Sequence, residues 1–311
     1  VFVSTLDDLK TVAEHQRARG TPPSIEGDRA VGPGTNTSST TAAILTAARA
    51  LVAAGIEPEH DIVFAAVAQE ETGLVGMRDL YQAYEETAIE FIDVLGDGRR
   101  ISYGALGIHW WKVIATGPPG HTLSGGLPNV NLGIARAVER ILGLPQPEQF
   151  ADRTTRINIS MLQSGTVFNH KPPEGWFSLD IRSLDAEIIA SIEKDVQSIL
   201  DDVTVETGIA FRLEAENLVP GGQIDGARES NLVTWSEHVS NRLGLEPTFS
   251  NTGSANLNIA IAAGTPAIGL GGSRGGERGY PGEWADINAM MRSAEHVVLL
   301  AIALGSETPA P

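Results

Sequence analysis

The sequence contains no cysteine. This absence excludes disulfide bonds, a thiolate nucleophile and cysteine-ligated zinc, but it leaves the cellular compartment open. No apolar run reaches the roughly 20 residues that a bilayer-spanning helix needs. Basic residues are also few, because 22 Lys and Arg stand against 39 Asp and Glu, which gives a net charge of −17. A chain of this charge lacks the basic face that binds nucleic acid or an anionic membrane, so we expect neither as a partner.

The composition that remains is typical of a globular α/β protein. The chain has 311 residues, 42% hydrophobic content and 34 glycines, which suits two domains or one large one. It opens in the apparent strand Val1-Phe-Val-Ser, with neither an initiator Met nor a signal peptide in front. We therefore expect upstream residues to be missing, and we leave the localisation undetermined between cytoplasmic and secreted.

One stretch organises the first part of the chain. The apolar run 62–68 predicts a buried parallel strand, and it ends in a polar turn that carries Glu70 and Glu71. Open α/β sheets place their chemistry beyond the carboxyl ends of such strands. Two adjacent carboxylates there suit two roles, since one can bind a cation while the other accepts a proton from water. The alternative interpretation is a solvated acidic turn before a helix.

The predicted pattern of elements differs between the two ends and the middle of the chain. Before residue 105 and after residue 218 it is that of an α/β domain, with helices at 40–54, 78–87, 231–244 and 285–304 and strands at 1–4, 91–95 and 265–270. The middle predicts the order β-α-β-β-α-β, with elements at 108–116, 129–142, 157–163, 175–181, 184–203 and 210–216. This order is that of a ferredoxin-like domain. We expect an α/β domain made of residues 1–105 and 218–311, with residues 106–217 inserted.

Several spaced motifs resemble one family, the di-zinc hydrolases that include aminoacylase, carboxypeptidase G and peptidase T. The matching segments, in chain order, are Gly32-Pro-Gly, Thr41-Ala-Ala-Ile-Leu, Ala68-Gln-Glu-Glu-Thr-Gly, Gly104-Ala-Leu-Gly, Gly117-Pro-Pro-Gly-His, Gly165…Asn169…Pro172, Leu179-Asp-Ile-Arg, Gly264-Thr-Pro-Ala and Glu283-Trp. The resemblance implies a zinc-aminopeptidase-like α/β catalytic domain with an inserted ferredoxin-like (βαββαβ) lid. It also implies a homodimer formed through the lid domain.

The zinc ligands that the resemblance implies are mostly replaced. The family holds two zinc ions through His, Asp, Glu, Asp and His, and these positions fall on Leu6, Asn36, Glu71, Leu95 and Gly279. Glu70 matches the general base, and Asp8 matches the Asp that accompanies the first His. Glu71 and Asp8 are therefore a remnant of a metal site, and we expect no bound cofactor, because zinc usually needs four ligands. Neighbouring residues that could compensate are Asp7, Asp93, Asp97 and His109.

The residues that the family resemblance assigns to the substrate are retained more fully than the zinc ligands. His121 matches the lid His that stabilises an oxyanion in the partner subunit's site, although it also suits a turn histidine that caps the next segment. Asn169 and Arg182 match residues that hold the substrate, and Asn36 offers an amide oxygen to it. With Glu70, His121 completes the expected catalytic pair.

Three functional hypotheses follow. The first is a hydrolase-like enzyme that acts on an amide-like or other acyl bond of a small carboxylate-bearing substrate, with a degenerate and metal-free site. The second is a non-catalytic pseudoenzyme that binds a small ligand. The third is an ordinary zinc metallopeptidase in which the ligands lie at positions other than those assigned above.

Overall fold

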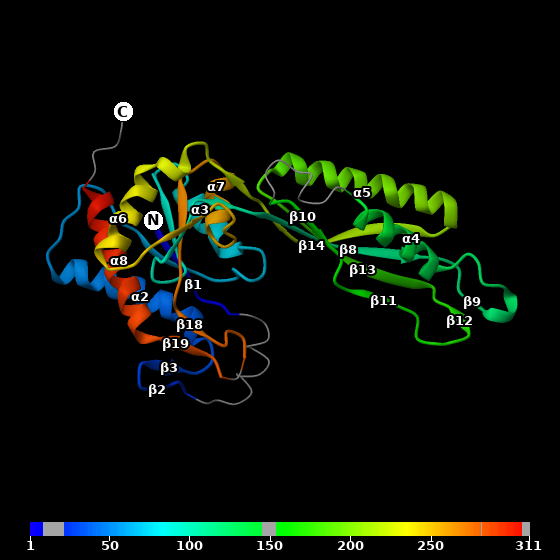
Figure 1. Cartoon of the computed structure of the whole chain (residues 1–311), viewed down its shortest axis with the longest axis horizontal. Coiled ribbons are helices and arrows are strands. Elements are labelled where there is room, and N and C mark those ends of the chain that lie inside the picture. The colour runs from blue at the N-terminus through cyan, green and yellow to red at the C-terminus, as the bar shows by residue number, and fades with distance from the viewer. Residues whose placement is uncertain (9–21, 145–153, 281, 307–311) are drawn as a thin grey trace. The chain divides into compact units, whose positions relative to one another are not determined.

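The computed structural model describes residues 1–8, 22–144, 154–280 and 282–306 (Figure 1). The chain divides into two compact units. Unit 1 comprises Val1–Ala105 with Gln223–Pro311, and unit 2 comprises Leu106–Gly222. The chain therefore leaves unit 1, forms unit 2 as a continuous insertion and then returns to unit 1.

A six-stranded sheet lies at the centre of unit 1. Its strand order is β16-β6-β17-β5-β1-β4, and β17, β5, β1 and β4 run parallel to one another. The strands are β1 (Phe2–Thr5), β4 (Phe64–Val67), β5 (Phe91–Val94), β6 (Arg100–Ser102), β16 (Thr248–Ser250) and β17 (Ala267–Gly271). β6 is antiparallel to β17. The carboxyl ends of four strands consequently meet at one edge of the sheet.

Helices cover this sheet and complete the core of unit 1. They are α2 (Thr35–Ala53), α3 (Val75–Tyr84), α6 (Asn231–Arg242), α7 (Leu257–Ala262) and α8 (Ile287–Gly305). α8 packs against α2 and α6, as Figure 1 shows. Its buried Val297, Leu300 and Ala301 belong to the same apolar cluster as Phe2 and Ile92. By length and composition α8 could cross a membrane, but one face of it is buried against α2 and α6, while Met291 and Leu299 are exposed.

Short elements complete unit 1. A second, four-stranded sheet has the order β18-β19-β3-β2, and the remaining strands and 3₁₀ turn are brief: β2 (Ser24–Glu26), β3 (Arg29–Val31), β7 (Gly104–Ala105), η3 (Ala227–Glu229), β18 (Gly275–Gly276) and β19 (Trp284–Asp286). β15 (Gly222–Gln223) lies where the chain returns from unit 2.

Two expectations about unit 1 are wrong in detail. β4 is not a buried central strand, because only Val67 of its four residues is buried and it is the last strand in the order of the described sheet. A short apolar run fits an edge strand as well as a central one, since periodicity does not separate the two. The first helix begins at Thr35 rather than Thr40. The Ser and Thr hydroxyls that suggested a turn lie inside its first turns instead, where Ser39 and Thr40 each donate to a carbonyl three residues earlier.

Unit 2 has the ferredoxin-like order of elements. These are β8 (Gly107–Thr116), α4 (Val130–Leu142), β10 (Arg156–Asn158) with β11 (Leu162–Ser164), β13 (Glu174–Ser183), α5 (Ala186–Thr207) and β14 (Ala210–Val219). The sheet order is β10-β13-β8-β14, with β11 also paired to β13. Both helices pack on this sheet, and their apolar faces form one cluster with Phe177, Leu179 and Ile181 of β13. Unit 2 also contains a small two-stranded ribbon. It pairs β9 (Gly120–His121) with β12 (His170–Lys171), and η1 (Thr122–Ser124) follows β9.

Candidate functional site

The candidate site of unit 1 lies at the edge where the parallel strands end. β1 leads into Asp7 and Asp8, and β4 leads into Glu70 and Glu71. β5 leads into Leu95, and β17 leads into the loop that carries Arg274 and Arg278. The ends of parallel strands in an open α/β sheet are the usual place for a ligand.

The turn after β4 is held by the segment after β1. The backbone N–H groups of Glu70 and Glu71 donate to the two carboxylate oxygens of Asp7, over 3.0 and 3.2 Å. Gln69 adopts a left-handed backbone conformation with φ of 61°, which is uncommon for a residue other than glycine. Asp7 therefore fixes the two glutamates in place from the neighbouring strand.

An arginine from the loop after β17 neutralises the acidic side of the site. The Arg278 guanidinium hydrogen-bonds to the Glu71 carboxylate, and its Nε lies 3.6 Å from Asp8 Oδ1. These side chains are all largely shielded from solvent, with exposures of 31% for Arg278, 22% for Glu71 and 12% for Asp8. One cation thus lies between the two carboxylates that the sequence assigned to a metal remnant.

The loop that carries Arg278 is anchored by Glu283. The Glu283 carboxylate accepts hydrogen bonds from the backbone N–H groups of Gly34, Asn36 and Gly279, over 2.9 to 3.4 Å. Burial raises the pKa of Glu283, and Asp8 raises it further, whereas these three donors lower it. Glu283 therefore joins the start of α2 to the arginine loop.

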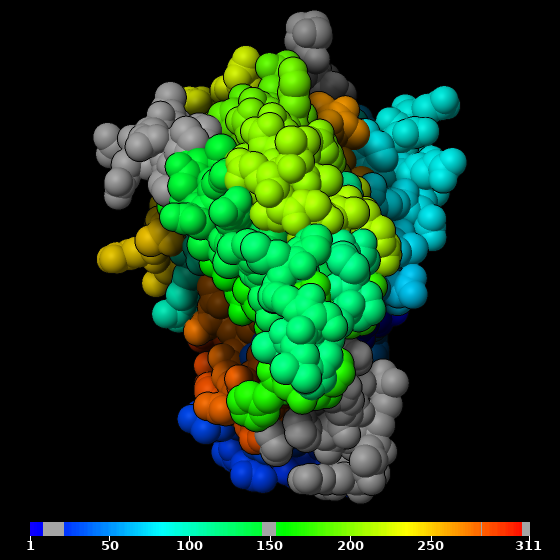
Figure 2. All heavy atoms as spheres, turned by 90° about the vertical axis from the view of Figure 1, so that its right-hand side faces the viewer, coloured from blue at the N-terminus to red at the C-terminus, as the bar shows by residue number. Residues whose placement is uncertain are grey.

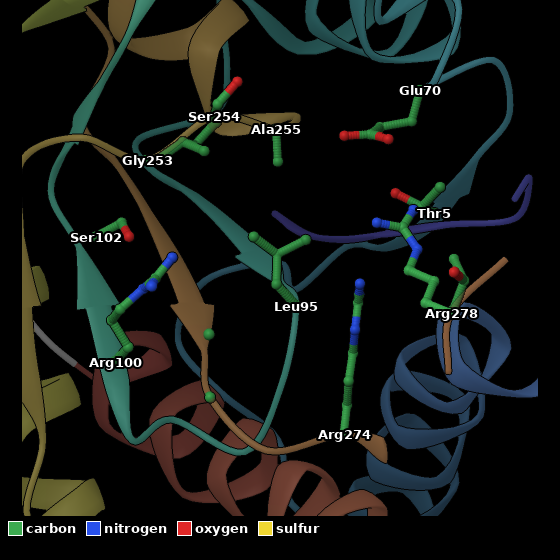
Figure 3. Close-up of a pocket in the computed structure, with 14 residues that line it drawn as sticks. Thr5, Glu70, Leu95, Arg100, Ser102, Gly253, Ser254, Ala255, Arg274 and Arg278 are labelled. Carbon is green, nitrogen blue, oxygen red and sulfur yellow. The ribbon is translucent and has the colours of Figure 1, made fainter. Parts of the chain in front are cut away.

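A cavity of about 320 Å³ opens between these segments. Figure 3 shows Glu70, Arg274 and Arg278 directed toward the space around Leu95, with Arg100 approaching from the opposite side. The other lining residues are mostly small or hydroxylic: Thr5, Thr37, Ser102, Gly253, Ser254, Ala255, Leu257, Gly271 and Gly272. The cavity is therefore polar and cationic on one side, and Glu70 is the carboxyl group on its wall.

Glu70 has the most perturbed carboxyl group of this site. The pKa of Glu70 is raised to about 8, first by burial and then by the neighbouring charges of Glu71 and Asp93, while Arg278 acts in the opposite direction. A carboxyl group with a pKa near 8 exchanges protons close to neutral pH. This property suits a general acid or base.

The structure places different side chains at the expected ligand positions. Leu6 is 55% exposed, and Thr5, one residue earlier, lines the cavity instead. Likewise Gly279 offers only its backbone N–H, to Glu283, whereas the preceding Arg278 reaches the cavity. Leu95 lies in the cavity as expected. Each one-residue difference arises because sequence spacing alone does not fix which side of a strand end or loop faces inward.

The four compensating residues have other partners. Asp7 holds the Glu70–Glu71 turn. Asp93 is fully buried and accepts from Asn256 and the Leu257 backbone at the start of α7, and burial raises its pKa to about 6. The remaining two are paired elsewhere: Asp97 with Arg99 and Arg292, and His109 with Glu193 of unit 2.

These residues do not fit a pair of zinc ions. Zinc requires imidazole, thiolate or carboxylate ligands, usually four for each ion. The positions that face the cavity carry Thr5, Leu95 and Arg278, and a guanidinium repels a cation instead of binding it. In the part of the chain that the structure describes, no group of three or more His, Cys, Asp or Glu side chains is arranged to hold a metal.

Asn36 lies beside the cavity but is not among its lining residues. It is 3% exposed, and its Nδ2 donates to the Trp284 carbonyl over 3.3 Å. The next residue, Thr37, lines the cavity in its place. The side chain of Asn36 thus joins α2 to β19.

The expected lid residues belong to unit 2. His121 on β9 faces His170 on β12 in the strand register, and Asn169 links them: its amide lies 3.0 Å from His121 Nε2 and 2.8 Å from His170 Nδ1. His121 Nδ1 also accepts the Leu123 backbone N–H, in the manner of a capping histidine. The ribbon around β9 and β12 faces the viewer in Figure 2. Arg182 lies on β13 and binds Asp180 through two nitrogens.

The sequence interpretation missed the arginines of the cavity. Arg274 and Arg278 occur in the glycine-rich segment 271–282, which resembles a surface loop in composition. Two cations in a loop directly after a buried strand, in a chain of net charge −17, were the signal that could have identified them. Gly272 explains why the loop lies so close to the sheet: it has φ of 127°, and a Cβ there would lie 2.5 Å from Asp97 Oδ1.

Comparison with solved structures finds the same fold in several peptidases. Aminopeptidase PepT from Bacillus cereus is 21% identical, with a TM-score of 0.79 over 96% of this chain and 79% of that one. A tripeptidase from Staphylococcus aureus is 19% identical, with a TM-score of 0.81 over 98% and 80%. A Bacillus subtilis protein described as a dinuclear metal binding peptidase from the M20 family is 14% identical, with a TM-score of 0.69 over 97% and 80%. Identities this low show a common fold alone.

Sequence comparison adds the family. No curated protein matches the chain, but residues 8–303 match the profile of Peptidase family M20/M25/M40. The match spans both units and most of the chain, and it confirms the family resemblance of the sequence motifs. The chain belongs to Peptidase family M20/M25/M40.

Proposed function

We propose that this chain is a hydrolase of the aminoacylase, carboxypeptidase and peptidase T type that works without a metal ion. It would cleave an amide-like or other acyl bond in a small carboxylate-bearing substrate. The observation that carries the proposal is the position of Arg278 between Asp8 and Glu71. A guanidinium there supplies positive charge to the carboxylates and removes the need for a metal cation to balance them.

Glu70 is the base of the proposed reaction. Its pKa of about 8 means that it can accept a proton from water and return it to a leaving group near neutral pH. Proton transfer by one positioned side chain contributes roughly 10²–10⁴-fold to a rate. The neighbouring Arg278 would stabilise negative charge that develops on the attacked carbonyl oxygen.

Unit 2 has supporting roles in this proposal. His121 would stabilise the oxyanion and Asn169 would bind the substrate, as the family resemblance implies, through a homodimer formed by the lid. Arg182 is a weaker candidate for substrate binding, because it would have to give up two hydrogen bonds to Asp180. Asn36 would contact the substrate only if its side-chain amide gave up the hydrogen bond to the Trp284 carbonyl.

The test combines metal analysis with turnover. Protein purified without added metal is analysed by elemental mass spectrometry, and hydrolysis of N-acyl amino acids and dipeptides is measured with and without a chelator. We expect chelator-insensitive turnover that falls about 100-fold or more in Glu70→Gln. Glu86→Gln, at an exposed position, is the matched control. Two zinc ions per chain, or turnover abolished by the chelator, would refute the proposal.

A second candidate function is ligand binding without catalysis. It is favoured by Thr5 and Leu95 on the cavity wall, because neither side chain can activate water. Bound zinc does so by lowering the pKa of water to about 7. The same panel separates the two functions. Binding of panel members with no product, in wild type and Glu70→Gln alike, would favour the binding protein.

A further inference from the structure

Two arginines that line the cavity, Arg274 and Arg100, form no ion pair with its carboxylates in the described part of the chain. Arg274 follows β17, and Arg100 begins β6, which runs antiparallel to β17 and so starts at the same edge of the sheet. Neither guanidinium has a hydrogen bond or ion pair with another residue in the described part of the chain. Figure 3 shows both side chains rising toward the space around Leu95.

Two hydroxyl groups also line the cavity. Thr37 is 2% exposed, and its Oγ1 has no hydrogen-bond partner among the described residues. Ser102 is 4% exposed and also lines the cavity. A buried hydroxyl without a partner is costly, so a ligand acceptor at this wall would stabilise it. Thr37 also lies in the first turn of α2, where the helix dipole favours negative charge.

The balance of charge around the cavity points to an anion. Arg278 is engaged by Asp8 and Glu71, which leaves Arg274 and Arg100 facing the cavity with Glu70. Burial lowers the pKa of Arg274, and the adjacent Arg278 cation lowers it further, because two guanidinium groups repel each other. An anion placed beside Arg274 would stabilise its guanidinium, as the charges of Glu70, Asp8 and Glu71 do in part.

We propose that Arg274 and Arg100 form a subsite for an oxyanion of the ligand, a carboxylate or a phosphate group, with Thr37 and Ser102 as further donors. Guanidinium groups bind both oxyanions through paired N–H donors, which gives geometric specificity. A cavity of about 320 Å³ is at the small end of ligand sites, so the group it holds is the size of an amino acid residue. This inference deepens the proposed function and rests on it for the identity of the cavity as the substrate site.

The test measures binding by isothermal titration calorimetry on the full chain. The probes are inorganic phosphate, N-acetylglycine and the neutral N-acetylglycinamide. We expect at least one anion to bind, and N-acetylglycinamide to bind about 10-fold more weakly or worse, because it lacks the charged acceptor. The preference between phosphate and N-acetylglycine identifies which oxyanion the subsite takes.

Variants locate the binding. Arg274→Met and Arg100→Met should each weaken anion binding about 10-fold or more, and Arg274→Lys should retain part of it. Arg212→Met is the matched control: this arginine lies on β14 of unit 2, is paired with Glu214 and should bind the anion like wild type. If a thermal scan shows that Arg274→Met does not fold, the test of the subsite rests on Arg100→Met. Arg100 is exposed, so its replacement should not disturb folding. Binding unchanged in Arg100→Met and Arg274→Lys, or no binding of either anion at millimolar concentration, would overturn the subsite.

This experiment is independent of turnover. Glu70→Gln removes the proposed base but keeps both arginines, so it should bind the anions at least as well as wild type. Anion binding without any hydrolysis would leave the subsite intact and refute the metal-free hydrolase. Hydrolysis that persists in Arg274→Met and Arg100→Met with unchanged KM would refute the subsite and leave the hydrolase intact.

Discussion

Replacing Glu70 by Gln should change how the stability of unit 1 depends on pH. The pKa of Glu70 is about 8 in the folded chain, against an ordinary value of 4.5. Between these two pH values the folded state holds a proton that the unfolded state has lost. The stability contributed by the protonated carboxyl is therefore complete below pH 4.5 and is lost as the pH rises toward 8.

The expected magnitude follows from one proton. A difference of one bound proton changes the free energy of unfolding by about 1.4 kcal/mol per pH unit, so Glu70 alone lowers it by about 3 kcal/mol between pH 5 and 7. This is an upper value, because the nearby Arg278 cation favours the ionised form of Glu70. Gln carries no charge at any of these pH values, so Glu70→Gln should gain stability relative to wild type as the pH rises.

Urea unfolding at a series of pH values tests this expectation. Trp235 and Trp284 lie in unit 1 and Trp110, Trp111 and Trp176 in unit 2, so fluorescence should be combined with hydrogen exchange to assign the transition to unit 1. Glu86→Gln serves as the control and should parallel wild type. A difference between Glu70→Gln and wild type that is constant from pH 5 to 7 would refute the reasoning. A difference of the opposite sign would mean that Arg278 keeps Glu70 ionised.

Three further perturbations have defined outcomes. Arg278→Met leaves Glu71 and Asp8 without their shared cation, so it should lower the free energy of unfolding at pH 7 by about 1–3 kcal/mol, and an unchanged value in urea unfolding would contradict this. Asp7→Ala removes the acceptor of two backbone N–H groups and should cost about 1–3 kcal/mol while accelerating amide exchange at Glu70 and Glu71, which equal exchange rates would contradict. Burial lowers the pKa of His296 to about 4 from 6.5, so wild type should lose up to about 3 kcal/mol as the pH falls from 6.5 to 4. His296→Leu should not show this loss, and an unchanged acid profile in that variant would disprove the assignment.

Much of the fold could be predicted because it depends on patterns that the sequence repeats over many residues. The six elements expected in unit 2 appear in the expected order, but the single strand predicted at 157–163 is divided into β10 and β11. The ends of elements were harder to predict, because a helix start rich in Ser and Thr fits both a turn and a first helical turn. The start of α2 at Thr35 is an example.

The site was harder to predict than the fold. Glu70 and Glu71 could be found because they follow a strand directly, whereas Thr5 and Arg278 each lie one residue from the position assigned by spacing. The sequence around Arg100 did not identify it as a site residue. Its place beside the cavity arises because β6 is antiparallel to β17 and begins at the edge of the sheet where β17 ends. Only tertiary structure brings residues from four separate strand ends together.

The ion pairs of Arg278 with Asp8 and Glu71 mean that the positive charge beside these carboxylates belongs to the chain itself. A guanidinium is covalently attached to the chain and stays protonated over the physiological pH range. It cannot be removed by dialysis or exchanged for a competing ion, as a coordinated metal can. The positive charge that Arg278 brings to this cavity is therefore fixed by the sequence and does not depend on the supply of metal in the cell.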